Sequence, residues 1–135
     1  MDFIEWNEKY SVKVSLIDEQ HKHLFRIVNN FYEKFKNKSP EDEVANIISE
    51  LQGYARMHFA TEELYLKRYG LGQYDSHKIE HDSFMKEVDS MADKYKQGKI
   101  VLTIDIMKFV RNWITNHVLG TDMKYSAIFA NNGIK

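Results

Sequence analysis

Apolar residues recur at the three- and four-residue spacing of an α-helix in four separate segments of the chain. Such a stripe allows a helix to bury one face against its neighbours. The pattern predicts helices over residues about 18–37, 41–69, 76–97 and 103–119. Asp18 is the expected N-cap of the first helix, and Ser39 followed by Pro40 is a typical start for the second. Four helices with short links are most simply an antiparallel up-down-up-down four-helix bundle, so we expect an all-α fold.

The segments outside these helices are short. Residues 1–17 are expected to form an extended N-terminal arm, because Val12, Val14 and Leu16 alternate with polar residues. Three aromatic residues in the arm offer apolar surface that can pack against another part of the molecule: Phe3, Trp6 and Tyr10. A short C-terminal turn at 121–129 is expected to pack back on the bundle.

Composition narrows the class of protein. A chain of 135 residues is expected to form one domain, residues 1–135. The net charge of −1 and the lack of a basic stripe argue against nucleic acid as a partner. No apolar run suits a membrane span or a secretory signal, so we expect a cytoplasmic protein. The absence of cysteine excludes disulfides, thiolate metal sites and iron–sulfur clusters.

The most informative stretch contains His77 and His81, four residues apart and therefore on one helix face. Apolar residues continue that face at helical spacing: Phe84, Met85, Val88, Met91, Ala92 and Tyr95. Burying two imidazoles side by side is costly unless something binds both of them. A single core histidine is usually structural, but this pair points to a metal ion.

Other polar residues interrupt the apolar stripes at the same height. In an up-down bundle, the start of the first and third helices and the end of the second and fourth meet at one end of the molecule. The residues that fall there are His21, His58, Glu62, His77, His81, His117 and Asp122. We therefore expect these seven side chains to form one cluster.

Five imidazoles and two carboxylates exceed the needs of one ion. Two six-coordinate ions, bridged by both carboxylates and by an oxide or hydroxide, use the set and leave one coordination position open. The donor chemistry suits iron, with manganese as the alternative.

His117 and Asp122 are five residues apart, which places them about 140° apart around a regular helix. We therefore predict that the fourth helix breaks or bulges near Gly120, so that Asp122 reaches the cluster. We expect the neighbouring polar residues to lie outside the cluster. His23 should lie in solvent, Glu63 should turn away from the metals, and Glu80 should lie at the surface or behind a metal ligand.

The spacing of these residues resembles that of the bacterial hemerythrins. The resemblance spans almost the whole chain and is carried by residues 17–21, 58–63, 77–81 with Phe84, and 113–117 with Asp122, and the arm residues Trp6 and 10–12 also fit. It implies two non-heme iron ions with a bridging oxo or hydroxo group. In that family pattern His77, His81 and His117 hold the coordinatively full iron.

The same resemblance gives His21 and His58 to the iron with the open position, and makes Glu62 and Asp122 the bridges. It implies reversible binding of dioxygen, for storage or delivery, rather than enzymatic activity. Ile114 matches a family pocket position, and Trp113 and Phe59 are also placed to form walls of an oxygen pocket, although plain core packing explains each of the three equally well.

Two other functions remain open from the sequence. One is a diiron enzyme: an oxidase, a peroxidase or a nitric-oxide-handling protein. The other is an oxygen or redox sensor that acts through a separate partner, although the sequence indicates no particular protein partner.

Overall fold

A computed structural model describes residues 3–36, 40–69, 72–98 and 103–134. Within these ranges every regular element is helical, and no strand is present. The elements are the 3-10 turn Glu8–Tyr10, α1 (Ser15–Lys36), α2 (Pro40–Tyr69), α3 (Tyr74–Lys96), α4 (Thr103–Trp113), a π-helix (Ile114–Thr121) and α5 (Met123–Asn131). Ser39, the expected N-cap of α2, lies outside the described residues.

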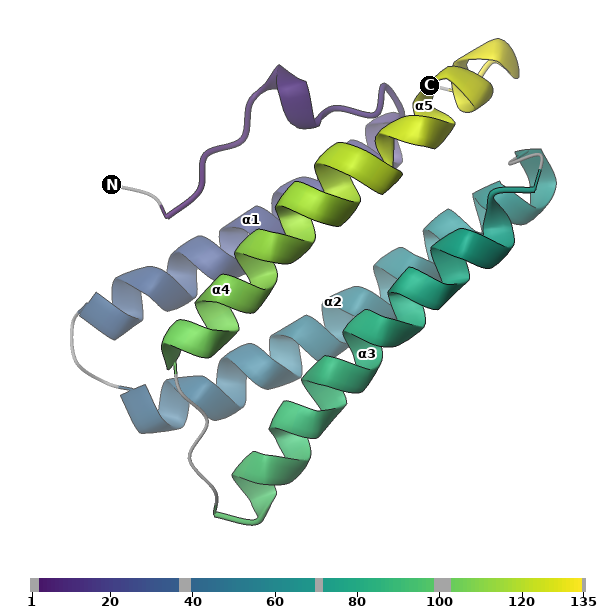
Figure 1. Ribbon diagram of the computed structural model, residues 1–135. Coiled ribbons are helices and arrows are strands. Elements are labelled where there is room, and N and C mark those ends of the chain that lie inside the picture. The colour runs from purple at the N-terminus through teal and green to yellow at the C-terminus, as the bar shows by residue number, and fades with distance from the viewer. Residues whose placement is uncertain (1–2, 37–39, 70–71, 99–102, 135) are drawn as a thin grey trace.

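Figure 1 shows the arrangement as four long rods, with α4, the π-helix and α5 following one another along the fourth. The rods alternate in direction, which confirms the predicted antiparallel four-helix bundle. The N-terminal arm crosses the outside of the bundle and meets it again near α5 (Figure 1). Among the described residues, no helix combines the length and apolar character that crossing a membrane requires.

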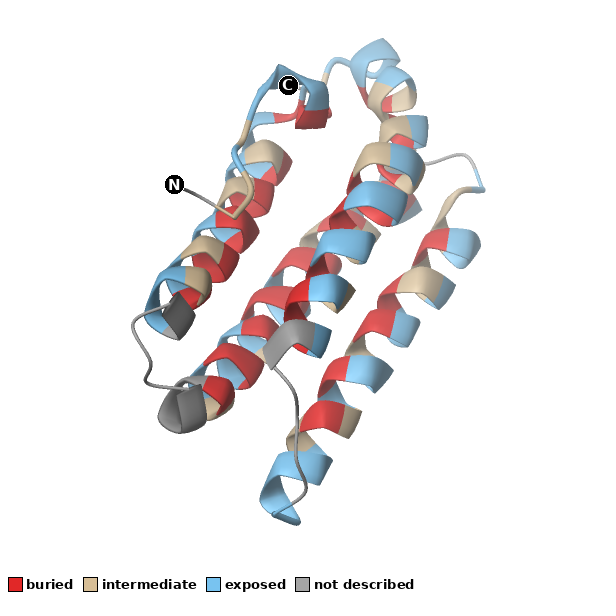
Figure 2. Ribbon diagram, turned by 60° about the vertical axis from the view of Figure 1, so that its left-hand side comes forward, coloured by how far each residue is buried: buried red, intermediate tan, exposed pale blue. Residues whose placement is uncertain are grey.

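The buried residues lie on the faces that the rods turn toward one another (Figure 2). They form two apolar clusters. The larger one fills the body of the bundle and includes Leu24, Leu51, Phe84 and Val110. The smaller one joins the arm to the last helix: Val12, Val14, Ile17, Leu66, Tyr125 and Phe129.

The arm ends earlier than predicted, because α1 begins at Ser15. The two-residue alternation therefore holds for Val12 and Val14, which are buried, and fails for Leu16, which is 48% exposed. Once the chain turns helical, Ile17 rather than Leu16 faces the core.

Asp18 is not the N-cap of α1, as the sequence had suggested, since it lies within the first turn. Its carboxylate instead accepts hydrogen bonds from the backbone N–H of Val12 at 2.8 Å and from the hydroxyl of Ser11. These bonds tie the arm to the start of α1.

The aromatic residues of the arm pack against α1, a partner that the sequence left open. Phe3 lies 5.2 Å from Tyr32, and Tyr10 lies 4.9 Å from Phe25, measured between ring centroids. Trp6 also packs on Phe25, at 5.5 Å. The arm therefore covers apolar surface that α1 would otherwise expose to water.

The apolar stripe of α3 is shorter than predicted. Val88 and Met91 are buried, but Tyr95 is 39% exposed and lies in the last turn of the helix. Gly98 follows with a φ of 72°, a left-handed conformation that suits the end of a helix. The packed part of α3 therefore ends at Ala92, which is half-buried and packs against the larger cluster.

Candidate metal centre

Seven polar side chains meet inside the bundle, at the end where α1 and α3 begin. Each of them is at most 1% exposed to solvent. They come from α1, α2, α3, the π-helix and the residue that follows it: His21, His58, Glu62, His77, His81, His117 and Asp122. The structure thus brings together all seven residues that the sequence singled out.

The seven side chains form two groups of possible metal ligands. In each group, the ligand atoms lie within 4.8 Å of one another. One group is Glu62 with His77, His81 and His117, and the other is His21 and His58 with Glu62 and Asp122. Glu62 belongs to both groups and so stands where a bridge between two ions is needed.

Asp122 also reaches both groups. Its Oδ1 atom lies 2.6 Å from Nε2 of His77 and 2.9 Å from Nε2 of His117. Its Oδ2 atom lies 3.2 Å from Nε2 of His21. Two carboxylates therefore join the two sets of imidazoles, as the coordination arithmetic requires.

The π-helix explains how Asp122 reaches the cluster. The backbone N–H of Asp122 donates to the carbonyl of His117 at 2.7 Å, a bond across five residues instead of four. The extra residue per turn brings the side chains of His117 and Asp122 onto one face of the helix. The predicted irregularity in the fourth helix is therefore confirmed, but it spans Ile114–Thr121 instead of a single point at Gly120.

All five imidazoles turn Nε2 toward the centre of the cluster. Three of them have an acceptor behind the ring. Nδ1 of His58 lies 2.7 Å from Oε1 of Gln20, an atom that can only accept a hydrogen bond. The proton of His58 therefore sits on Nδ1, and Nε2 presents a lone pair to the cluster.

The other two acceptors are carboxylates. Nδ1 of His81 lies 2.9 Å from Glu63, and Nδ1 of His117 lies 3.1 Å from Glu80. Glu63 thus faces the outer edge of His81, away from the centre of the cluster, as expected. Glu80 lies behind a cluster histidine, which was the second of the two places that the sequence allowed.

Several buried polar atoms of the cluster make no well-directed hydrogen bond among the described residues, even where an oppositely charged atom lies close. They include Nε2 of His21, His81 and His117, together with Oε1 of Glu62 and Oδ2 of Asp122. An unsatisfied buried polar group costs about 1–3 kcal/mol. Because these atoms converge on two points and combine lone pairs with negative charge, the donor set fits two divalent cations.

The electrostatics favour carboxylates that stay ionised. Burial alone would raise the pKa of Glu62, but His58, His77 and His81 outweigh burial and hold that pKa well below its usual range. Burial and the charge of Glu62 raise the pKa of Asp122, but the opposing effects of His117 and His21 prevail and lower it.

The histidine pKa values move in two directions. Burial lowers the pKa of His77, but the carboxylates of Asp122 and Glu62 outweigh burial and raise it to about 9. Burial prevails at His58 and lowers its pKa, despite the attraction of Glu62. Two carboxylates thus create negative charge that cations can neutralise.

Aromatic rings lie flat against two of the cluster imidazoles at close contact distance. Phe59 stacks on His81 with ring centroids 3.9 Å apart, and Trp113 stacks on His117 at the same distance. These contacts fix the ring planes of the two histidines. Ile114, the third proposed pocket residue, is 1% exposed and belongs to the main apolar cluster.

Two tyrosines beside the cluster were not recognised from the sequence. Tyr54 stacks on His58 with ring centroids 5.2 Å apart. The hydroxyl of Tyr125 donates a hydrogen bond of 2.6 Å to Oε2 of Glu62. The position of Tyr54 one helical turn before His58 was a usable signal. Tyr125 carried none, because its partner is distant in sequence.

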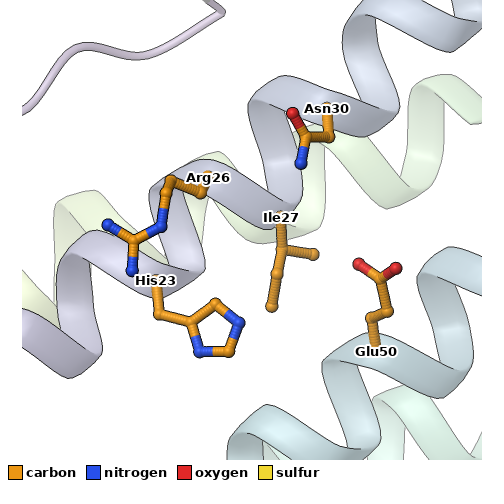
Figure 3. A pocket seen from close by; sticks show the side chains of 5 residues that line it. All are labelled: His23, Arg26, Ile27, Asn30 and Glu50. Carbon is orange, nitrogen blue, oxygen red and sulfur yellow. The ribbon is translucent and has the colours of Figure 1, made fainter.

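His23 is exposed, as predicted, and lies outside the cluster. It lines an open surface pocket between α1 and α2 with Arg26, Ile27, Asn30 and Glu50 (Figure 3). His23 is therefore a natural control for substitutions of His21, two residues earlier on the same helix.

Comparison with known proteins agrees with this architecture. Residues 12–129 match the family model of the hemerythrin HHE cation binding domain. The chain is 38% identical to a bacteriohemerythrin of Clostridium acetobutylicum over 126 residues, which cover 89% of this chain and 96% of that one. It is 28% identical to a bacteriohemerythrin of Methylococcus capsulatus, over 93% of this chain and 95% of that one.

Solved structures agree on the fold. A crystal structure of a wild-type hemerythrin superposes with a TM-score of 0.84 at 27% identity, covering 93% of this chain and 97% of the other. The fold and the clustered donors are those of a helical-bundle metal-binding protein. The chain belongs to the hemerythrin family.

Proposed function

We propose that this chain binds dioxygen reversibly at a centre of two non-heme iron ions, for oxygen storage or delivery. The observation that carries the proposal is the pair of buried donor groups that share Glu62. Membership of the hemerythrin family supports the same reading.

Each donor has a role in this proposal. His77, His81 and His117 would hold one iron. His21 and His58 would hold the other iron, which would keep a free position for dioxygen. Glu62 and Asp122 would be shared by the two ions, in keeping with their positions near imidazoles of both groups.

Two ferrous ions, joined by an oxo or hydroxo bridge, would supply the two electrons that dioxygen accepts and returns. The chain provides the surroundings in which this exchange stays reversible. Imidazole ligands are neutral, so the centre carries less negative charge than one built from carboxylates. Less negative charge stabilises high-valent iron less, which disfavours cleavage of the O–O bond.

The apolar residues around the cluster exclude water. Ile114 is buried, and Phe59 and Trp113 lie against cluster histidines. We propose that these three side chains form the walls of the oxygen pocket. A dry pocket slows the loss of reduced oxygen, because proton delivery to it needs water or a titratable side chain.

The proposal is tested by mixing the iron-loaded, fully reduced protein with air and recording its optical spectrum. We expect a stable oxygenated form that returns to the diferrous state under vacuum. Immediate conversion to the ferric form with release of peroxide would contradict reversible binding and favour the enzyme or sensor alternatives.

Two substitutions test the site, one at a proposed ligand and one at a control position. His21→Ala removes a proposed ligand and should abolish the oxygenated spectrum, whereas His23→Ala changes an exposed histidine on the same helix and should leave it intact. Metal analysis of the purified protein distinguishes iron from manganese. Two equivalents of manganese in place of iron would contradict the assignment of the metal.

A further inference from the structure

The outward-facing nitrogens of the cluster histidines have unequal partners. In the three-histidine group (His77, His81 and His117), two rings are backed by carboxylates. Nδ1 of His81 donates to Glu63 at 2.9 Å, and Nδ1 of His117 donates to Glu80 at 3.1 Å. Negative charge therefore stands directly behind two of these three rings.

The two-histidine group (His21 and His58) has no such charge among the described residues. His58 donates to the neutral amide oxygen of Gln20 at 2.7 Å. Nδ1 of His21 is buried and has no hydrogen-bond partner among those residues. The two groups thus differ in the charge behind their rings as well as in their number of histidines.

The neutral partner of His58 is held in place by further hydrogen bonds. Nε2 of Gln20 donates to the hydroxyl of Thr61 at 3.2 Å, and that hydroxyl donates to the carbonyl of Met57 at 3.1 Å. Because the hydroxyl proton is used by Met57, the oxygen of Thr61 is free to accept from Gln20. The amide oxygen of Gln20 therefore faces His58.

A carboxylate also has a second anchor in the three-histidine group. Oε1 of Glu80 accepts a hydrogen bond from the hydroxyl of Thr121 at 2.9 Å as well as the one from His117. Thr121 is the last residue of the π-helix that carries His117. Glu80 thus fixes both the orientation of the ring and the end of the irregular segment.

An acceptor behind a metal-binding imidazole orients the ring, and a charged acceptor makes it a stronger donor to the metal. Loss of such a partner typically lowers metal affinity about 10–100-fold. We propose that Gln20, Glu63 and Glu80 are positioning residues that make the two halves of the centre unequal, so that the three-histidine group binds a divalent ion first and the two-histidine group holds its ion more weakly. This inference rests on the proposed function, since it requires both groups to bind metal.

The order of binding is tested by titrating the metal-free protein with Co²⁺. Calorimetry gives the affinity of each step, and proton NMR shows which histidines are bound. Each imidazole bound through Nε2 to paramagnetic Co²⁺ gives one strongly shifted, exchangeable Nδ1–H signal. At one equivalent we expect three such signals, from His77, His81 and His117. Two signals, or five at partial intensity, would overturn the proposed order.

Three histidines outnumber two, so the order alone does not prove a role for the acceptors. Charge swaps at nearly constant shape separate the two causes. Gln20→Glu should tighten the second Co²⁺ step about 10-fold and leave the first unchanged. Glu80→Gln should weaken the first step about 10-fold and leave the second unchanged. If neither swap moves its own step, or both swaps move both steps equally, the inference is wrong.

Controls separate this effect from misfolding. Glu50→Gln alters an exposed carboxylate in the surface pocket and should leave both steps unchanged. The thermal midpoint of each metal-free variant reports its folding. If Gln20→Glu does not fold, Glu63→Gln tests the same idea, with an expected 10-fold weakening of the first step.

The inference and the proposed function fail in different ways. Two unequal Co²⁺ steps that respond to the swaps support the inference, even if the iron-loaded protein does not bind dioxygen reversibly. Reversible oxygenation combined with two equal steps would overturn the inference and leave the proposed function standing. A protein that binds no metal would overturn both.

Discussion

Two buried tyrosines beside the metal cluster differ in how their hydroxyl groups are satisfied. The hydroxyl of Tyr125 donates to Glu62, whereas the hydroxyl of Tyr54 has no partner among the described residues. Burial raises the pKa of both phenols well above the usual value, and the charges of Glu62 and Asp122 raise each of them further. Both residues are therefore uncharged donors next to negative charge.

This difference predicts opposite effects for the same substitution. Tyr54→Phe removes an unsatisfied buried hydroxyl and should leave stability unchanged or raise it by about 1 kcal/mol. Tyr125→Phe removes a hydrogen bond to a carboxylate and should lower stability by about 1.5–3 kcal/mol. Urea unfolding of the metal-free variants measures both values. A larger loss for Tyr54→Phe than for Tyr125→Phe would contradict this account.

Ile114 gives a prediction about the proposed oxygen pocket. Ile114→Ala should shorten the lifetime of the oxygenated form, because the truncated side chain admits water. Ile48→Ala makes a similar cavity in the same apolar cluster, ten positions before His58 on α2, and serves as the control. Both variants should lose about 2–5 kcal/mol of stability. Optical spectroscopy measures the lifetimes. Equal lifetimes in the two variants would show that Ile114 is not part of the proposed pocket.

At the scale of elements, the π-helix is the feature that the site depends on most. It raises the question of whether Gly120, which lies within it, is needed for the irregular backbone. Gly120 does not adopt a positive φ, and a Cβ atom added there meets nothing within 4 Å. The wide turn is therefore compatible with other residues at this position.

We accordingly predict that Gly120→Ala keeps both metal ions and raises stability by about 0.5–1 kcal/mol, since glycine is unfavourable in helices. Gly72 has a φ of 93°, which an alanine rarely adopts. Gly72→Ala has equally open surroundings but should be destabilising, because the backbone itself would be strained. Thermal unfolding and metal analysis check the pair, and loss of metal from Gly120→Ala would show that the glycine is required.

Much of this architecture could be predicted from local patterns. Helical periodicity places four amphipathic segments, and their alternation brings the seven donors to one end of the bundle. The five-residue spacing of His117 and Asp122 predicts an irregular helix. These inferences succeed because each depends on spacing within one segment and on simple topology.

The parts that could not be predicted depend on contacts between distant residues. Asp18 is a residue type that often caps helices, but here its carboxylate binds the arm. Gln20 faces His58 only because α1 lies beside α2. Tyr125 and Glu62 are also far apart in sequence. Such pairings leave no periodic signal, so the hydrogen-bond partners of the cluster residues were seen only in the structure.

At the scale of the whole molecule, buried charge gives the metal-free protein an unusual dependence on pH. The pKa of His77 is raised from 6.5 to about 9, so its pairing with the carboxylates stabilises the fold fully below pH 6.5 and is lost as the pH rises through 9. Burial lowers the pKa values of His21 and His117, but Asp122 outweighs burial and raises both. These two histidines therefore also stabilise the metal-free fold less as the pH rises. The lowered pKa of His58 opposes them.

The two carboxylates determine how the stability of the metal-free protein changes at acidic pH. The pKa values of Glu62 and Asp122 are depressed from 4.5 and 3.8, so their contribution is present above these values and lost as the pH falls below them. The metal-free protein should therefore be most stable between about pH 4.5 and 6.5. From pH 6.5 to 9 it should lose up to about 3 kcal/mol.

The metal-loaded protein should behave in the opposite way. Imidazoles must be neutral to bind metal, so affinity falls as the pH drops below about 6.5. Thermal unfolding of both forms from pH 5 to 9 measures the two trends. Parallel trends in the two forms would contradict imidazole ligation.

The order of the donors along the chain has a consequence for biosynthesis. His21, His58, Glu62, His77 and His81 all precede α4, whereas the π-helix supplies His117 and positions Asp122. During synthesis, the first four of these imidazoles are therefore translated before Asp122. A nascent chain can thus offer part of each donor group but cannot complete either group, so the full cluster forms only after the fourth rod has docked.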